Sequence, residues 1–185
     1  MSTSLTLNTR QAETVDRLLS AGLEVLRETG HEALTIRMVA HRAQVSTATA
    51  YTYLDSKQHL FAELFWRHLR AQPEETYEGD VVARVQDAIR TMGYWIAKES
   101  ELAAAVTPAL LANEPSVERL RMLIGEEFLR RFEAALGASD PLVEEALVLV
   151  LAGGLLQAGM KMVTYDELGD RLAAAVEVVL RGVVR

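Results

Sequence analysis

Hydroxyl side chains crowd into one short stretch of this 185-residue chain, "STATAYTY" at residues 46–53. The stretch holds four serine or threonine hydroxyls and two tyrosines, whereas half of the whole chain is apolar. Hydroxyls on short side chains bind phosphate oxygens and base edges, and their small size lets a backbone approach a nucleic acid closely. The stretch therefore predicts a surface that contacts DNA. A polar face that is merely solvated is the alternative, and spacing alone leaves it open.

The elements around this stretch have the proportions of a helix-turn-helix. Apolar spacing predicts a first helix over about 10–29 that ends at Gly30, and a second helix that begins after an N-cap at Thr35. A third helix is expected over 46–53, and a fourth after Asp55-Ser56. In a helix-turn-helix the second of the paired helices, here 46–53, enters the major groove. Val45, Ala50 and Leu54 are expected to hold it to the headpiece core.

The outward side chains are the predicted DNA contacts. Ala48 suits a thymine methyl, while Tyr51 and Tyr53 are long donors suited to phosphates. Lys57, in the first turn of the fourth helix, adds its ammonium to free backbone N–H groups, and Arg37 can reach a phosphate or a guanine. The full predicted set is Arg37, Ser46, Thr47, Ala48, Thr49, Tyr51, Thr52, Tyr53 and Lys57.

The remainder of the chain predicts a helical body. The polar segment Gln72–Asp80 separates the fourth helix from helical patterns over about 81–98, 101–112, 116–136, 141–164 and 166–184. Apolar residues occupy nearly every face of 141–164, so a partner chain is expected to cover one side of it. The last two helices thus predict a homodimer interface. The expected organisation is a flexible arm at 1–9, a DNA-binding headpiece at 10–55 and a dimerising, ligand-binding body at 56–185.

Composition narrows the function. The net charge of −7 lies in the body, because residues 1–59 hold six Lys/Arg and six Asp/Glu, against 13 and 20 in the rest. The chain has no cysteine, no signal peptide pattern and no apolar run of the roughly 20 residues that cross a membrane. A cytoplasmic protein without membrane contact is therefore expected. The four histidines lack metal-site spacing, and no catalytic or nucleotide-binding motif occurs, so we expect no enzyme, metal or cofactor.

The run "TIRMVAHRAQVSTATAYTYLDSKQHL" at 35–60, preceded by "ETGHEAL", resembles the TetR family of bacterial transcriptional repressors. The matching residues are Gly30, Thr35, Ala40, Ala43, Val45, Ser46, Tyr51, Tyr53 and Lys57. The resemblance spans about 50 residues. It implies an all-α fold of about nine helices, with a three-helix DNA-binding domain and a helical ligand-binding and dimerisation domain. Gln44 departs from the pattern, because the family usually has Gly in the turn. Ala50 and Leu54 stand where larger side chains are usual.

The resemblance also implies a small-molecule cavity among the central helices. The candidate lining consists of apolar side chains with two polar ones, and the excess of Met and Trp favours an apolar or amphipathic effector. These residues are Trp66, Met92, Trp95, Thr107, Met122, Phe128 and Gln157. Plain core packing is the alternative for each of them.

The sequence as a whole predicts a homodimeric, ligand-responsive repressor on a near-palindromic double-stranded DNA operator. The alternative is a helical small-molecule or lipid carrier whose headpiece no longer binds DNA.

Overall fold

A computed structural model describes residues 9–138 and 140–183, and within these ranges the fold is all-α with nine helices and no strand. The predicted fold class is confirmed. The headpiece helices are α1 (Thr9–Ala33), α2 (Ile36–Arg42) and α3 (Thr47–Tyr53), and α4 (Lys57–Arg70) leads out of it. The body contains α5 (Val81–Lys98), α6 (Ser100–Ala109), α7 (Pro115–Leu136), α8 (Pro141–Gly159) and α9 (Tyr165–Val183).

Hydroxyl caps set the starts of the short headpiece helices. The Thr35 Oγ1 accepts from the Met38 N–H at 3.3 Å, and the Ser46 Oγ accepts from the Thr49 N–H at 3.0 Å. Ser56 caps α4 in the same way, at 2.9 Å from the His59 N. Each cap satisfies a backbone donor that the first turn of a helix leaves free. Two-turn helices thereby obtain fixed starts, and their inward side chains are buried in one core.

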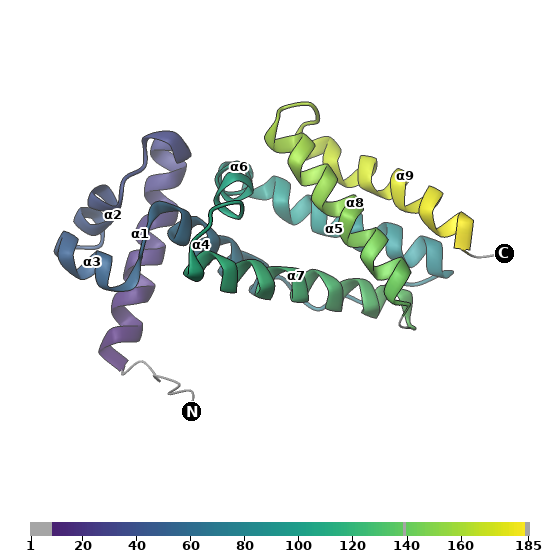
Figure 1. The fold of residues 1–185 in the computed structure, drawn as a ribbon, viewed down its shortest axis with the longest axis horizontal. Coiled ribbons are helices and arrows are strands. Elements are labelled where there is room, and N and C mark those ends of the chain that lie inside the picture. The colour runs from purple at the N-terminus through teal and green to yellow at the C-terminus, as the bar shows by residue number, and fades with distance from the viewer. Residues whose placement is uncertain (1–8, 139, 184–185) are drawn as a thin grey trace.

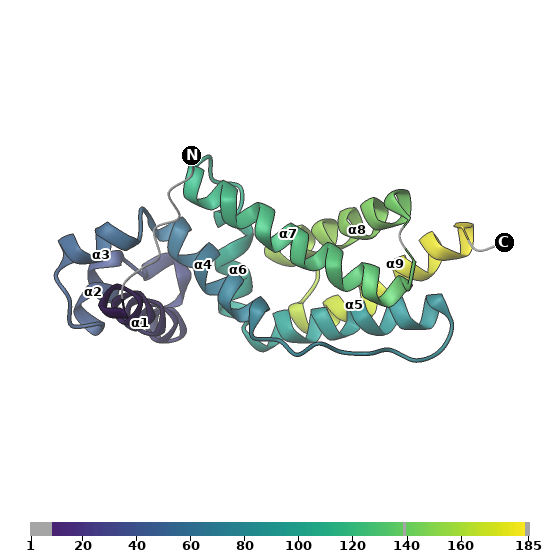
Figure 2. The ribbon, with the colours of Figure 1, turned by 90° about the horizontal axis from the view of Figure 1, so that it is seen from below.

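The molecule is elongated, with the headpiece at one end and the body at the other (Figure 1). In the view turned by 90°, α7 and α8 lie on one side of the body and α5 on the other (Figure 2). Helices α5 and α9 make the most extensive helix–helix contact, at a point where Gly93 faces Gly169. A Cβ placed on Gly93 would lie 2.6 Å from the Gly169 Cα, so the two backbones touch without a side chain between them.

Several predicted boundaries differ from the structure. Helix α8 ends at Gly159 instead of 164, because Lys161 has a positive φ of 61° and Thr164 caps the next helix. Helix α6 ends at Ala109 instead of 112. Helix α1 already begins at Thr9, so the predicted arm is shortened, and its other residues, 1–8, lie outside the described ranges. The break at Gly30 is confirmed, since its φ of 75° and ψ of 165° interrupt α1.

Helix α8 has an unusual composition. Among the helices of the described residues it is the one long and apolar enough to cross a membrane by length and composition. Its first turn nevertheless carries Glu144, Glu145 follows, and one face of the helix packs on α6, α7 and α9. Leu142 and Leu149 on its opposite face are 79% and 65% exposed. An apolar face of this kind marks a surface that is covered by something else.

The close crossing of α5 and α9 makes a direct test of the body's packing. Gly93→Ala is expected to lower the free energy of unfolding by about 1–3 kcal/mol, because the added methyl must push two backbones apart. Urea denaturation measures the effect. The matched control is Gly125→Ala on α7, where an added Cβ meets no atom within 4 Å, and stability should stay equal or rise by roughly 0.5–1 kcal/mol. Equal stabilities of the two variants would contradict the close backbone contact between Gly93 and Gly169.

Candidate nucleic-acid interface and ligand cavity

The third helix turns its polar side chains away from the core, as predicted. Ala50 is fully buried and Leu54 is 2% exposed, so these two residues anchor α3 to the headpiece. Ala48 and Thr52 are exposed, and Tyr51 is 54% exposed. A short helix with one buried edge and a broad polar face has the shape that fits a major groove.

Several hydroxyls of α3 already have partners within the helix. The Ser46 and Thr49 hydroxyls lie 2.8 Å apart, and the Thr52 Oγ1 donates to the Ala48 carbonyl at 3.1 Å. Each of these hydroxyl oxygens can still accept a hydrogen bond. A hydroxyl whose proton is already donated within the helix cannot also donate to a phosphate. Within the described ranges, the hydroxyls of Thr47 and Tyr51 form no hydrogen bond. These two side chains are therefore the freest polar groups on the face.

The other predicted contacts flank this face unequally. Arg37 is exposed at the start of α2 and forms no ion pair with any described residue. Tyr53 is half-buried and packs against the core, so only its outer edge is accessible. Lys57 is also half-buried, and its ammonium donates to the carbonyls of His31 and Glu32, at 3.0 and 3.1 Å. The lysine predicted to bind a phosphate thus first caps the end of α1, with one donor remaining.

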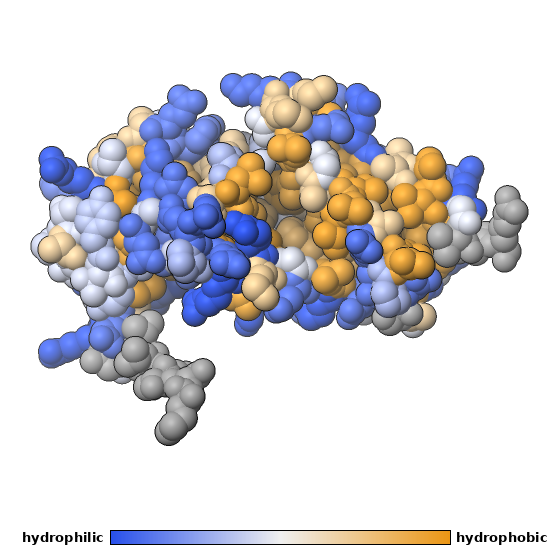
Figure 3. Space-filling model, in the orientation of Figure 1, coloured by the Kyte–Doolittle hydropathy of each residue, from blue (hydrophilic) through white to orange (hydrophobic). Residues whose placement is uncertain are grey.

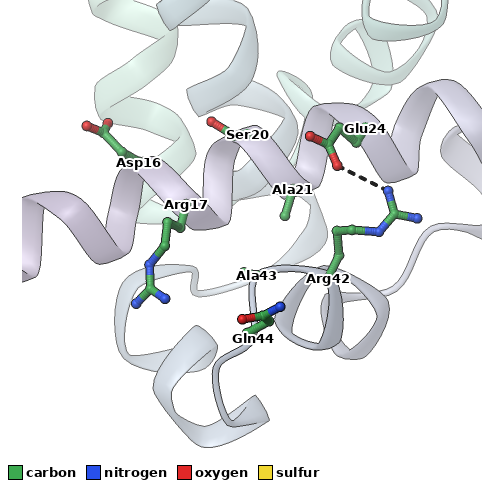
Figure 4. A pocket seen from close by; sticks show the side chains of 8 residues that line it. All are labelled: Asp16, Arg17, Ser20, Ala21, Glu24, Arg42, Ala43 and Gln44. Atoms are coloured by element: carbon green, nitrogen blue, oxygen red, sulfur yellow. Dashed lines mark hydrogen bonds and ion pairs between the residues drawn. The ribbon is translucent and has the colours of Figure 1, made fainter.

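A polar pocket of about 330 Å³ lies between α1 and the turn that joins α2 to α3 (Figure 4). On one side of it Arg42 is held by Glu28, at 2.5 and 2.9 Å, and by Glu24 at 3.1 Å. The hydrogen bond from Arg42 lowers the pKa of Glu28, so the acid stays ionised and Arg42 offsets one of the two negative charges of this cluster.

Arg17 lines the same pocket and extends from α1 toward the turn (Figure 4). Its guanidinium is exposed and forms no ion pair with a described residue. Sequence reasoning missed this cation, because it lies on the first helix, far along the chain from the motif. Its outward position on an amphipathic helix was the available signal, but only the fold brings it beside the turn.

The body holds an almost wholly apolar cavity of about 280 Å³ between α4, α6, α7 and α8. The rings of Phe65 and Phe128 lie on its wall with centroids 6.5 Å apart. Thr107 is the one hydroxyl in the lining, and it donates to the Ala103 carbonyl at 3.0 Å. The complete lining is Phe65, Val106, Thr107, Leu110, Leu111, Ile124, Phe128, Ala152, Leu155 and Leu156.

Only Thr107 and Phe128 of the seven predicted lining residues border this cavity. Met92 is 1% exposed within the core, and Gln157 lies in a groove between α8 and α9. Met122 is 61% exposed on α7, so its expected inward position was wrong. The rings of Trp66 and Trp95 are covered by Arg70 and Arg131, whose guanidinium carbons lie 5.5 and 4.6 Å from the ring centroids.

The end of α4 is held by a buried charge cluster next to the cavity. Arg131 is 7% exposed, and its Nε donates to Glu127 at 2.8 Å. Its other donors reach the carbonyls of Leu69, Gln72 and Pro73, at 3.4, 3.4 and 3.1 Å. A hydrogen bond from Arg130 lowers the pKa of Glu127, which keeps the buried carboxyl ionised. Arg131 of α7 therefore holds the C-terminal end of α4 in place.

Comparison with known proteins decides the family. Residues 18–64 match the family described as "Bacterial regulatory proteins, tetR family". The HTH-type transcriptional regulator Rv0767c of Mycobacterium tuberculosis (strain ATCC 25618 / H37Rv) is 40% identical over 179 residues, which are 95% of this chain and 84% of that protein. This chain belongs to the TetR family of transcriptional regulators. The predicted relationship is confirmed.

More distant relatives agree with this assignment. The HTH-type transcriptional repressor KstR of Rhodococcus jostii (strain RHA1) is 24% identical, with 92% of this chain and 84% of that protein covered. A TetR transcriptional regulator from Rhodococcus sp. RHA1 shares the fold with a TM-score of 0.76 at 18% identity, over 94% and 98% of the two chains. The multidrug binding protein EbrR, solved with ethidium, superimposes with a TM-score of 0.63 at 24% identity, over 91% and 97%.

Gln44, where the TetR pattern has Gly, is in the left-handed conformation with a φ of 55°. The turn thus has the left-handed conformation that glycine favours, although its residue is glutamine. Gln44→Gly is expected to raise the free energy of unfolding by about 1 kcal/mol, because glycine enters this conformation without steric cost. Thermal unfolding measures it. The control Gln58→Gly, in ordinary helical backbone of α4, should lower stability by roughly 0.5–1 kcal/mol. A loss of stability in both variants would contradict the strain at Gln44.

Proposed function

We propose that this regulator is a cytoplasmic repressor which binds a near-palindromic operator as a homodimer and is released by a small apolar effector. The observation that supports the proposal most directly is the outward polar face of α3, on which the hydroxyls of Thr47 and Tyr51 have no hydrogen-bond partner among the described residues. Two such helices, one from each subunit and about one DNA turn apart, match successive major grooves.

Charge on the headpiece favours one face for DNA. Glu24 and Glu28 on α1 share one cation, Arg42, so the pair repels a phosphate less than two free carboxylates would. Arg37 and Arg17 remain unpaired among the described residues, near the start of α2 and beside the turn. With so few free cations, base and hydroxyl contacts must supply much of the specific affinity. A modest dependence of binding on salt follows from this arrangement.

Dimerisation is supported by an apolar stripe on the outward face of α8. Its members recur at alternating spacings of four and three residues, which is the repeat of a helix–helix seam. They are Leu142, Ala146, Leu149, Gly153, Leu156 and Met160. On the space-filling surface an apolar patch covers α8 and the neighbouring part of α9 (Figure 3). We call the six residues of this stripe the α8 seam.

Helix α9 offers the small residues that such a seam needs. Ala175, Val178 and Gly182 are exposed beside the groove between α8 and α9. Large side chains from a partner's seam can pack against them. The α8 seam exposes Leu142, Leu149, Leu156 and Met160, at 79%, 65%, 46% and 54%, and a standard interface buries roughly 800 Å² per partner. These apolar side chains would supply the core of such an interface between two copies related by a two-fold axis.

The cavity supports control by an effector. Its wall includes Phe65 of α4, whose first turn binds the end of α1 through Lys57. An apolar molecule between Phe65 and Phe128 that prefers a shifted α4 would change the spacing of the two headpieces. Related structures support the idea in general terms, since EbrR was solved with ethidium. We propose an effector of apolar or amphipathic character for this chain.

Operator binding is tested by comparing two exposed tyrosines. Tyr51→Ala on α3 is expected to weaken binding about ten- to hundredfold, because it removes a free donor from the DNA-facing surface. Tyr94→Ala is the control, since this tyrosine on α5 is 60% exposed and far from α3. Gel-shift titrations would use DNA that the protein selects from its own upstream region. Equal affinities would contradict the assigned face, and a protein that selects no DNA would favour the carrier.

The homodimer is tested by placing a charge on the α8 seam. Leu149→Asp is expected to give a monomer in sedimentation at micromolar concentration, because two carboxylates would be buried near the symmetry axis. Tyr94→Asp should leave the dimer intact, since this residue is 60% exposed and belongs to α5, a helix on the other side of the body from α8 (Figure 2). A native protein that sediments as a monomer, or a dimer that survives Leu149→Asp, would refute this interface.

A further inference from the structure

Three helices meet at the one polar point on the wall of the apolar cavity. Among the described residues that line it, Thr107 of α6 alone has a polar side chain. The end of α8 lies against this residue, since a Cβ on Gly159 would be 3.1 Å from the Thr107 Cγ2 and 3.7 Å from its Oγ1. After a turn at 160–164, α9 begins with Tyr165. Because Gly159 has no side chain, the chain can pass closely around the Thr107 hydroxyl.

Tyr165 brings a second hydroxyl to this point. Its phenolic oxygen is buried, yet it has no hydrogen-bond partner among the residues that the structure describes. Burial raises the pKa of the phenol, and the neighbouring Thr107 hydroxyl partly offsets that rise. The phenol therefore stays protonated at neutral pH and keeps an unused donor. Buried donors are nearly always paired, so this one indicates a partner outside the chain.

The two hydroxyls can form a chain of hydrogen bonds that ends in the cavity. The Thr107 hydroxyl donates to the Ala103 carbonyl at 3.0 Å. In an α-helix that carbonyl also accepts the backbone N–H of Thr107, so it stays paired when the hydroxyl turns away. If Tyr165 donates to the Thr107 oxygen, the Thr107 proton is free to donate to a ligand oxygen. Every donor at this point then has an acceptor.

The rest of the lining limits what such a ligand can be. Phe65 and Phe128 lie on the wall, and no charged side chain occurs among the described lining residues. A charged group in the cavity would be buried without a counterion. A carbonyl oxygen, in contrast, needs just the one donor that Thr107 can supply. The cavity therefore suits an uncharged, largely apolar molecule with an oxygen acceptor at one end.

We propose that Thr107 and Tyr165 form the polar subsite of the effector cavity, and that the effector has a ketone or ester carbonyl which accepts from Thr107. This inference rests on the effector cavity of the proposed function. Thr107 touches the effector, whereas Tyr165 is a positioning residue that acts through Thr107. The apolar walls supply most of the affinity, and the carbonyl fixes which end of the molecule faces α9.

The test compares two uncharged naphthalene dyes. Prodan has a ketone, and its emission moves to longer wavelength when the carbonyl accepts a hydrogen bond. N-phenyl-1-naphthylamine has no oxygen, and its fluorescence rises in apolar surroundings. The native protein is expected to bind both dyes at one site, so that each displaces the other. Prodan bound to the native protein should emit at longer wavelength than Prodan bound to Thr107→Val.

Two variants remove the hydroxyls with little change of shape. Thr107→Val and Tyr165→Phe are each expected to weaken Prodan binding about five- to tenfold, because one hydrogen bond to the ligand is lost or misdirected. The affinity for N-phenyl-1-naphthylamine should stay unchanged in both. The double variant should bind Prodan no more weakly than Thr107→Val alone, since Tyr165 acts through Thr107.

Thermal unfolding without dye separates this role from a structural one. Tyr165→Phe should keep or raise the melting temperature, because its phenol has no partner in the described structure. A structural role alone would lower the melting temperature and weaken both dyes alike. Tyr77→Phe is the matched control, since this half-buried tyrosine lies beside Thr91 of α5 and does not line the cavity. Its affinities for both dyes should equal those of the native protein.

The outcomes distinguish this inference from the proposed function. Equal Prodan affinities in the native protein, Thr107→Val and Tyr165→Phe would overturn the subsite, leave water as the partner of the phenol, and leave the apolar cavity standing. Prodan that the second dye does not displace would bind elsewhere, which also overturns the subsite. A native protein that binds neither dye would overturn the effector cavity itself, and the gel shifts with Tyr51→Ala report separately on DNA binding.

Discussion

Helix α4 packs against the headpiece at its start and against the body along the rest of its length, and the architecture depends on these simultaneous contacts. Near its start Leu60 is fully buried against α1, so closely that a Cβ on Gly22 would lie 2.9 Å from it. At its middle Phe65 borders the cavity, and at its end Leu69 is held by Arg131 of α7. Because a helix of four turns is stiff, a displacement at any of these points is felt at the others. The headpiece and the body are thus joined by a rigid element instead of a flexible linker.

Two exposed ion pairs favour one orientation of the headpiece relative to the body. Arg27 of α1 pairs with Glu99 at the start of α6, and Arg67 of α4 pairs with Asp16 of α1. These pairs are exposed, so each contributes little stability, but together they favour one orientation. The acidic residues of the chain lie mostly in the body, which a polyanion repels. A DNA duplex therefore approaches the net-neutral headpiece, where Arg17 and Arg37 remain free.

Sequence patterns predicted the helices well because their causes are local. Thr35 and Ser46 cap helices through hydrogen bonds that span three residues, and Gly30 breaks α1 through its own backbone angles. The cavity depends on contacts between distant helices, which no local pattern contains. Met122 and Phe128 lie on the same helix with similar apolar character, yet one is exposed and the other lines the cavity. Periodicity identifies an apolar face but does not identify what that face meets.

Helix α8 shows why an evenly apolar helix is the hardest to interpret from sequence. It has three kinds of neighbour around its circumference: the core at Leu147 and Leu151, the cavity at Leu155, and open surface at Leu149. All three environments select leucine, so residue type carries no information on which is which. The distinction comes from angular position alone, and Leu156 stands where the last two meet. A helix that borders a cavity on one side and an uncovered apolar surface on the next cannot change one contact without changing the other, because its backbone moves as a unit. In this chain the filling of the cavity is therefore physically linked through α8 to the exposed apolar face of that helix, as the headpiece and the cavity are linked through α4.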